Sequence, residues 1–228
     1  MTQHVAVRTT RSSRGTGWVP FVLVALVLIP AVAGSLRLVE LAGGPLLLPA
    51  NPRMTASPAP VAVHVVSAIT YAAFGAFQFA SGFRRRRPRW HRMAGRVLVG
   101  LGLAVAFSAL WMTLLYARQP GTGELAYLLR LAFGSGMAAS LVLGVSATRR
   151  RDLAAHRAWM TRAFALALGA GTQTFTLGIG HAAFGTSELT TDLGLGAGWV
   201  INLAVAEYVI RRPHRRRTST ADVTARSS

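Results

Sequence analysis

The strongest constraint on this chain is a series of long apolar segments separated by polar segments, several of which are rich in arginine. Each apolar segment has about the length, near 20 residues, that a helix needs to cross the hydrocarbon core of a bilayer. A helix satisfies its own backbone hydrogen bonds in lipid, so these segments are expected to be helical. The sequence therefore predicts an all-α, polytopic transmembrane bundle with six spans, at residues 18–39, 61–83, 97–116, 125–146, 160–184 and 193–210.

The charge composition agrees with a membrane protein. Only 14% of the residues are charged, whereas a soluble domain has about 25%. The formal net charge of +18 would suggest nucleic-acid binding in a soluble protein. Here the arginines flank apolar segments, so membrane topology explains the charge and no nucleic-acid partner is expected. The chain has no cysteine, which excludes disulfides, thiol catalysis and iron–sulfur ligation.

The arginines also predict an orientation, because loops on the cytoplasmic side of a membrane are enriched in positive charge. With the N-terminus inside, 21 of the 25 arginines are cytoplasmic, and only Arg37, Arg53, Arg118 and Arg130 are outside. Both termini are therefore expected to be cytoplasmic. Residues 1–17 form a basic N-terminal tail, 18–210 the six-helix domain, and 211–228 a basic, disordered tail. An uncleaved first span is favoured over a signal peptide, although small residues at 31–34 leave cleavage open.

Four histidines near the ends of the spans are candidate ligands. His64 and His181 lie about one turn inside the outer ends of the second and fifth spans, and His91 and His156 lie at the cytoplasmic mouths of the third and fifth. Two imidazoles at matched depth are able to ligate a haem iron from opposite faces, which would make haem b the cofactor. The alternative is that these histidines bond to backbone carbonyls between closely packed helices, or anchor the helices at the interface.

Charged residues at the cytoplasmic mouths form a second set of candidates. Arg92, Arg96, Arg157 and Arg162 follow the inner histidines and are expected to meet anionic lipid headgroups. Glu207 is the one carboxylate well inside a predicted span. Its spacing to Arg211 predicts an i,i+4 ion pair, and a proton relay is the alternative.

Two basic turns carry a resemblance to a known family. The segments RPRWHRMAGRV (87–97) and RDLAAHRAWMTRAFAL (151–166) resemble the HRxxGR and HRxWMxR turns of the domain of unknown function 2306 family. The resemblance covers residues 61–185, includes His64, and implies a multi-span protein of the bacterial inner membrane without an established activity. Members often carry an arginine on the span after the second motif, where this chain has Gln173 or Thr174.

The sequence leaves three functions open. The first is electron transfer by a b-type haem or metal-binding protein that meets a redox partner or a quinone. The second is a cofactor-free, transporter-like protein, for which a cavity reaching the middle of the bilayer would be the sign. The third is a lipid-interacting scaffold. No nucleophile elbow, phosphate loop, HExxH motif or paired carboxylates occur, so hydrolytic enzymes are disfavoured.

Overall fold

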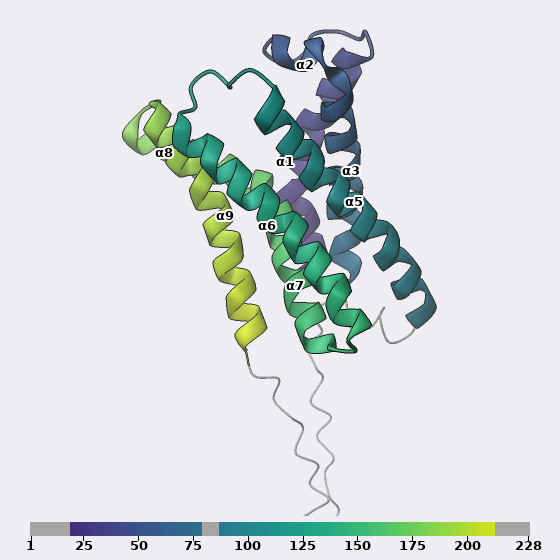
Figure 1. The fold of residues 1–228 in the computed structure, drawn as a ribbon. Coiled ribbons are helices and arrows are strands. Elements are labelled where there is room, and N and C mark those ends of the chain that lie inside the picture. Colours follow the sequence, from purple (N-terminus) through teal and green to yellow (C-terminus); the bar gives the residue numbers. More distant parts are fainter. Residues whose placement is uncertain (1–18, 79–86, 213–228) are drawn as a thin grey trace, which may run out of the picture.

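The protein forms an elongated bundle of α-helices in the computed structural model, which describes residues 19–78 and 87–212 (Figure 1). No strand occurs in these ranges. The helices, in chain order, are α1 (Val19–Leu41), α2 (Pro52–Ala56), α3 (Pro58–Gln78), α5 (Pro88–Leu115), α6 (Glu124–Arg149), α7 (Leu153–Ala167), α8 (Gly169–Phe184) and α9 (Glu188–Arg211). The predicted N-terminal tail, residues 79–83 of the predicted second span, and the chain beyond Arg212 lie outside the described residues.

Five of these helices are long and apolar enough to cross a membrane, namely α1, α3, α5, α6 and α9. Many of their large apolar side chains lie on the outside of the bundle rather than in a core; Phe21, Phe107 and Val205 are more than half exposed. Such a surface is suited to lipid and not to water. The predicted fifth span is formed by two consecutive helices, α7 and α8, which meet at Leu168.

The helices α5, α7 and α9 begin well before the apolar segments predicted for them. α5 starts at Pro88, inside the basic turn, because proline at the first helical position lacks only an N–H that would have no partner there. α9 starts at Glu188, within the segment interpreted as an outer loop. Ser187 caps this helix by accepting a hydrogen bond from the Thr190 N–H (3.1 Å). Capping chemistry therefore extends α5 and α9 beyond their apolar part.

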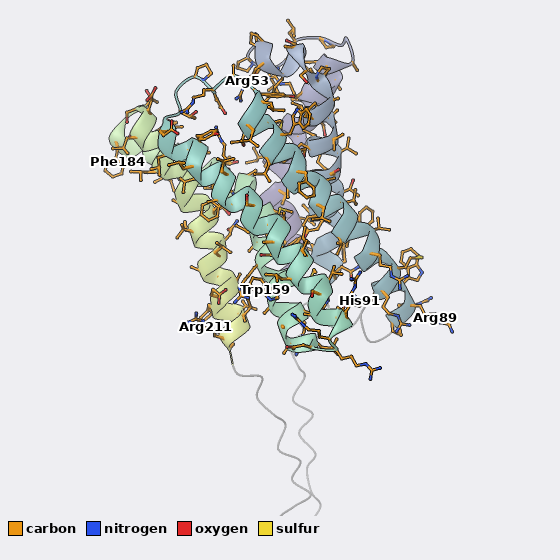
Figure 2. All side chains as sticks on the ribbon, viewed as in Figure 1. Arg53, Arg89, His91, Trp159, Phe184 and Arg211 are labelled. Atoms are coloured by element: carbon orange, nitrogen blue, oxygen red, sulfur yellow. The ribbon has the colours of Figure 1, made fainter. Side chains whose placement is uncertain are left out.

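The helices alternate in direction, so the charges of the chain separate along the bundle axis. One end, called here the arginine-rich end, carries most of the arginines described: Arg87, Arg89, Arg92, Arg96, Arg149, Arg150, Arg151, Arg157, Arg162, Arg211 and Arg212. The opposite end carries Arg37, Arg53, Arg118 and Arg130. Figure 2 shows Arg89 and Arg211 at the first end and Arg53 at the second.

Close helix packing depends on glycines at the crossings. A Cβ at Gly75 of α3 would lie 2.6 Å from the Phe164 ring of α7, and a Cβ at Gly102 of α5 would lie 2.8 Å from the Tyr71 ring. These rings and Leu141, which is fully buried, form the centre of the small core. Small residues at helix crossings are typical of membrane bundles, where packing rather than exclusion of water holds the helices together.

Polar side chains connect α8 to its neighbours. Gln173 donates through Nε2 to the Leu195 carbonyl (2.9 Å), and the Thr172 hydroxyl donates to Asn202 Oδ1 (2.7 Å). Asn202 in turn donates to the Ala165 carbonyl of α7 (3.1 Å). These bonds join α8 to α9 and α9 to α7.

Candidate functional site

A cavity of about 520 Å³ opens inside the half of the bundle away from the arginine-rich end. Its walls come from α1, α3, α5, α6, the α7–α8 junction and α9. On α5 it extends from Tyr116 to Val105, which is ~17 Å of helix at 1.5 Å per residue. Most of the wall is apolar, and the polar groups gather near the end that carries Arg53 and Arg130. Cavities of this size and character are typical of small-molecule sites.

Two arginines from distant parts of the chain meet at the mouth of this cavity. Arg53 comes from α2 and Arg130 from the second turn of α6. Both guanidinium groups donate to one oxygen, Gln119 Oε1, at 3.1 Å from Arg53 and 3.2 Å from Arg130. Arg53 donates further to Asn51 Oδ1 (3.1 Å) and to the Ala117 carbonyl (3.3 Å). All these acceptors are neutral, and the carboxylate of Asp192 attracts Arg130 only from beyond ion-pairing distance.

Burial has an electrostatic consequence for Arg53. Removal from water lowers the pKa of its guanidinium from the ordinary value, and the nearby Tyr116 acts in the opposite direction. An arginine stays protonated in proteins, so the group remains a partly desolvated cation. Such a cation gains more from an anionic partner than a solvated one does.

Two other charged groups near the mouth, Arg118 and Asp192, already have partners. Arg118 forms an ion pair with Glu124, a contact that raises the pKa of Arg118, and its guanidinium lies 4.8 Å from the centre of the Tyr127 ring. Asp192, at the start of α9, is only 3% exposed. Its carboxylate accepts from the backbone N–H groups of Gly123 and Ala126, both at 3.0 Å. Asp192 therefore caps the N-terminus of α6, where a negative charge is favourable.

The inner limit of the cavity lies at the break between α7 and α8. Leu166, Ala167, Ala170 and Gly171 line it there, together with Pro30 of α1. Since α7 has 15 residues and α8 has 16, the break falls near the middle of this segment. Discontinuous helices next to a central cavity are a feature of membrane transporters.

A proline and a glycine explain how α1 and α8 approach at this break. Pro30 has no N–H, so the carbonyl of Leu26 lacks its usual partner four residues on. A Cβ built on Gly171 would lie 2.4 Å from that carbonyl oxygen. Only glycine allows α8 to pack this closely against the backbone of α1.

The structure places His64 and His181 against different helices. His64, which lines the cavity, bonds through Nδ1 to the Val105 carbonyl (3.2 Å) and to the Ser108 hydroxyl (3.0 Å) of α5. His181 bonds through Nε2 to the Thr191 hydroxyl (3.1 Å) of α9. These hydrogen bonds hold the two imidazole rings on different helix pairs, α3 with α5 and α8 with α9. Within residues 19–78 and 87–212, no group of three or more His, Asp or Glu side chains is arranged to hold a metal ion.

The inner histidines occupy equivalent places at two helix starts. The backbone N–H of His91 bonds to the Arg87 carbonyl, and that of His156 bonds to the Asp152 carbonyl, both at 3.0 Å. Each histidine is thus the fourth residue of its helix. His156 also donates through Nδ1 to the Gly144 carbonyl of α6 (2.9 Å), which fixes its tautomer and joins α6 to α7.

The basic residues of the two motifs have different environments. Arg92, Arg96 and Arg157 are exposed at the arginine-rich end. Arg162 instead forms a two-point contact with Glu207, at 2.5 Å (Nε–Oε1) and 3.2 Å (Nη2–Oε2), and lies over the Trp159 ring. The predicted pair of Glu207 with Arg211 is present at 3.5 Å, but it is the longer of the two ion pairs. Arg162 and Glu207 thus join α7 to α9 at the arginine-rich end of these helices.

These helices and this cavity define an α-helical, multi-pass membrane protein with an internal cavity. Residues 61–210 match the family model described as predicted membrane protein, DUF2306, so the protein belongs to this family and the resemblance seen in the sequence is confirmed. The match extends beyond the predicted residue 185 and includes α9. No curated protein and no solved structure matches the chain.

Proposed function

We propose that this protein is a cofactor-free, transporter-like membrane protein that admits a solute into the cavity between α1, α3, α5, α6 and α8. The observation that carries the proposal is the cavity itself, which runs from the mouth at Arg53 and Arg130 to the α7–α8 break. The ion pair of Arg162 with Glu207 lies on the other side of this break and ties α7 to α9 there. This arrangement is expected of a carrier open toward one face.

In this proposal the arginine-rich end faces the cytoplasm of a bacterial cell and the cavity opens outward across the inner membrane. The support is the positive-inside tendency, since eleven described arginines lie at one end and four at the other.

The orientation is tested by replacing exposed threonines with cysteine, because the chain has no cysteine of its own. In intact cells, an impermeant thiol reagent should label Thr186→Cys, after α8, and should not label Thr148→Cys, near the end of α6. The reverse pattern would overturn the orientation.

Access of water to the cavity is tested with single cysteines on its walls. Ala68→Cys on α3, Ala109→Cys on α5 and Ala170→Cys on α8 each place a thiol on the lining. A charged methanethiosulfonate reagent applied from outside should modify all three, because only a hydrated thiol ionises and reacts. Intact protein mass measures the modified fraction.

The matched control is Ala132→Cys on α6, which is exposed at a similar depth but does not line the cavity. This thiol should stay unmodified in a membrane. Failure of all three lining positions to react, with the folded protein recovered from the membrane, would overturn the proposal of a solute cavity.

Electron transfer through haem b is the second candidate, and one observation favours it. Because the Val105 carbonyl accepts a hydrogen bond from Nδ1, His64 keeps a lone pair on Nε2 that is able to ligate iron. His181, by contrast, would have to ligate through Nδ1 or give up its bond to Thr191. An absorbance spectrum with and without dithionite separates the two functions. A Soret band lost in His64→Ala and His181→Ala would support haem, and a colourless protein from haem-replete cells would favour the cavity proposal.

A further inference from the structure

We infer that the cavity selects an amphiphilic organic oxyanion, whose charged head lies between Arg53 and Arg130 and whose apolar body lies in the interior of the bundle. This inference rests on the proposed function and names its class of solute. It is carried by the charges at the mouth, by the apolar wall, and by the way in which the loop residue Gln119 holds both guanidinium groups.

The charge balance of the mouth favours an anion. In the part of the chain that the structure describes, no carboxylate lies within ion-pairing distance of Arg53 or Arg130. Glu124 is paired with Arg118. Asp192 attracts Arg130 from a greater distance, but its hydrogen bonds are made with the backbone at the start of α6. Two guanidinium groups on one neutral amide oxygen repel each other, and an oxyanion between them removes this repulsion. A carboxylate or phosphate also offers the two or more acceptor oxygens that match guanidinium donors.

The wall of the cavity favours an apolar body behind the charged head. Below the arginines the lining is formed by residues such as Val65, Ile69, Ala106 and Met137, and ends at Trp199 near the α7–α8 break. Trp199 packs against Phe133 at 4.9 Å between ring centres. An inorganic anion at the arginines would leave the apolar part of this cavity empty, whereas an alkyl chain would occupy it.

The position of Trp199 supplies a direct measurement. Trp199 packs against Phe133, which lies three residues, ~5 Å, further along α6 than Arg130, so the indole lies within reach of a chain whose head is held by the arginines. A bromine atom at the end of an eight-carbon acid held by the arginines would therefore reach the indole and quench its fluorescence. The full-length protein is prepared in neutral maltoside detergent with Trp199 as its single tryptophan, after Trp18, Trp90, Trp111 and Trp159 are changed to phenylalanine. The probe is 8-bromooctanoate.

We expect saturable quenching by 8-bromooctanoate and about tenfold weaker quenching by 8-bromooctanol, which has the same body without the charge. Arg53→Gln and Arg130→Gln should each raise the half-saturating concentration of the acid about tenfold. Arg118→Gln is the matched control, because Arg118 lies at the same mouth but is paired with Glu124. This variant should change the half-saturating concentration by no more than about twofold. Gln119→Ala removes the contact that positions both guanidinium groups but no charge, so it should raise the half-saturating concentration by an intermediate factor.

Two further arms identify the source of the anion. Octyl phosphate should compete with the bromo acid if the head is recognised as an oxyanion in general. Competition by phosphatidylglycerol nanodiscs, but not by phosphatidylcholine nanodiscs, would assign the same site to an anionic lipid, and its absence would assign it to a solute from water.

Equal quenching by 8-bromooctanol and 8-bromooctanoate in the protein with all its arginines would overturn the inference, even if the arginine variants fail to fold. If the cavity thiols react but the acid has no advantage, the inference alone fails; if the thiols do not react, the proposed function fails as well.

Discussion

At the scale of single residues, some of the buried polar groups satisfy the open ends of helices. Asp192 is the clearest example, because it belongs to α9 but caps α6. Gly123, the residue before α6, has no side chain with which to cap the helix itself. A carboxylate buried at this place needs no basic partner, since two backbone N–H groups and the helix dipole stabilise its charge.

Removal of this cap should destabilise the protein. Asp192→Ala leaves two N–H groups without acceptors, which costs about 1–3 kcal/mol for each buried group. Asp192→Asn keeps one acceptor oxygen and should cost about half as much. Thermal unfolding in detergent, followed by circular dichroism, measures the difference in Tm. Glu188→Ala is the control in the same turn, because Glu188 is exposed; a loss of Tm equal to that of Asp192→Ala would contradict the capping role.

The sequence predicts some of the polar contacts described here, but it does not predict the arginine pair at the mouth of the cavity. The i,i+4 pair of Glu207 with Arg211 follows from local spacing. The positive-inside count places Arg130 on the outer side. Its position within an apolar segment is the sequence signal for a functional role, because ionisable residues inside spans are rare. Arg53 and Gln119 could not be placed beside it, because 66 residues separate Arg53 from Gln119 and only the folded chain brings them together.

At the scale of the helices, the apolar segments predicted where helices form but not how they are interrupted. Length and hydropathy determine a span, so five spans match single helices. The break at Leu168 follows instead from contacts with other helices. A Cβ at Gly169 would lie 2.3 Å from Trp199 Nε1, and Gly171 faces the Leu26 carbonyl. Neither neighbour is evident from the local sequence.

The contact between α1 and α8 at this break gives a prediction for Gly171. Gly171→Ala should destabilise the protein by about 1–3 kcal/mol, because the new methyl group meets a backbone oxygen that cannot rotate away. Gly178→Ala on the same helix is the matched control, since a Cβ there meets nothing within 4 Å. The Tm in detergent measures both variants. The packing argument would be wrong if Gly178→Ala were the more damaging change.

At the scale of the whole molecule, the helices form two halves that follow one another along the chain. α1, α2, α3 and α5 pack together, as do α6, α7, α8 and α9, and the halves meet mainly along α5 with α6 and along α1 with α8. The two halves are visible side by side in Figure 1, with the loop from α5 to α6 between them. The second half is held at its arginine-rich end by Arg162 and Glu207.

The contact between Arg162 and Glu207 should contribute to stability as a pair. Arg162→Glu and Glu207→Arg each place like charges together and should lower the Tm, whereas the double exchange should recover most of the loss. The coupling free energy of this partly exposed pair is expected to be about 0.5–1 kcal/mol. A double-mutant cycle in detergent measures it. Additive losses would show that the pair contributes nothing specific.

The two arginines at the mouth have a consequence at this largest scale. Arg53 belongs to the first half and Arg130 to the second, while Gln119, which holds both, lies in the loop that joins the halves. An anion between them is attracted to both halves at once, so its binding free energy depends on how far apart the halves stand. By thermodynamic reciprocity, any change that brings the halves together strengthens binding of the anion. Binding of the anion favours the closer arrangement of the halves by the same free energy.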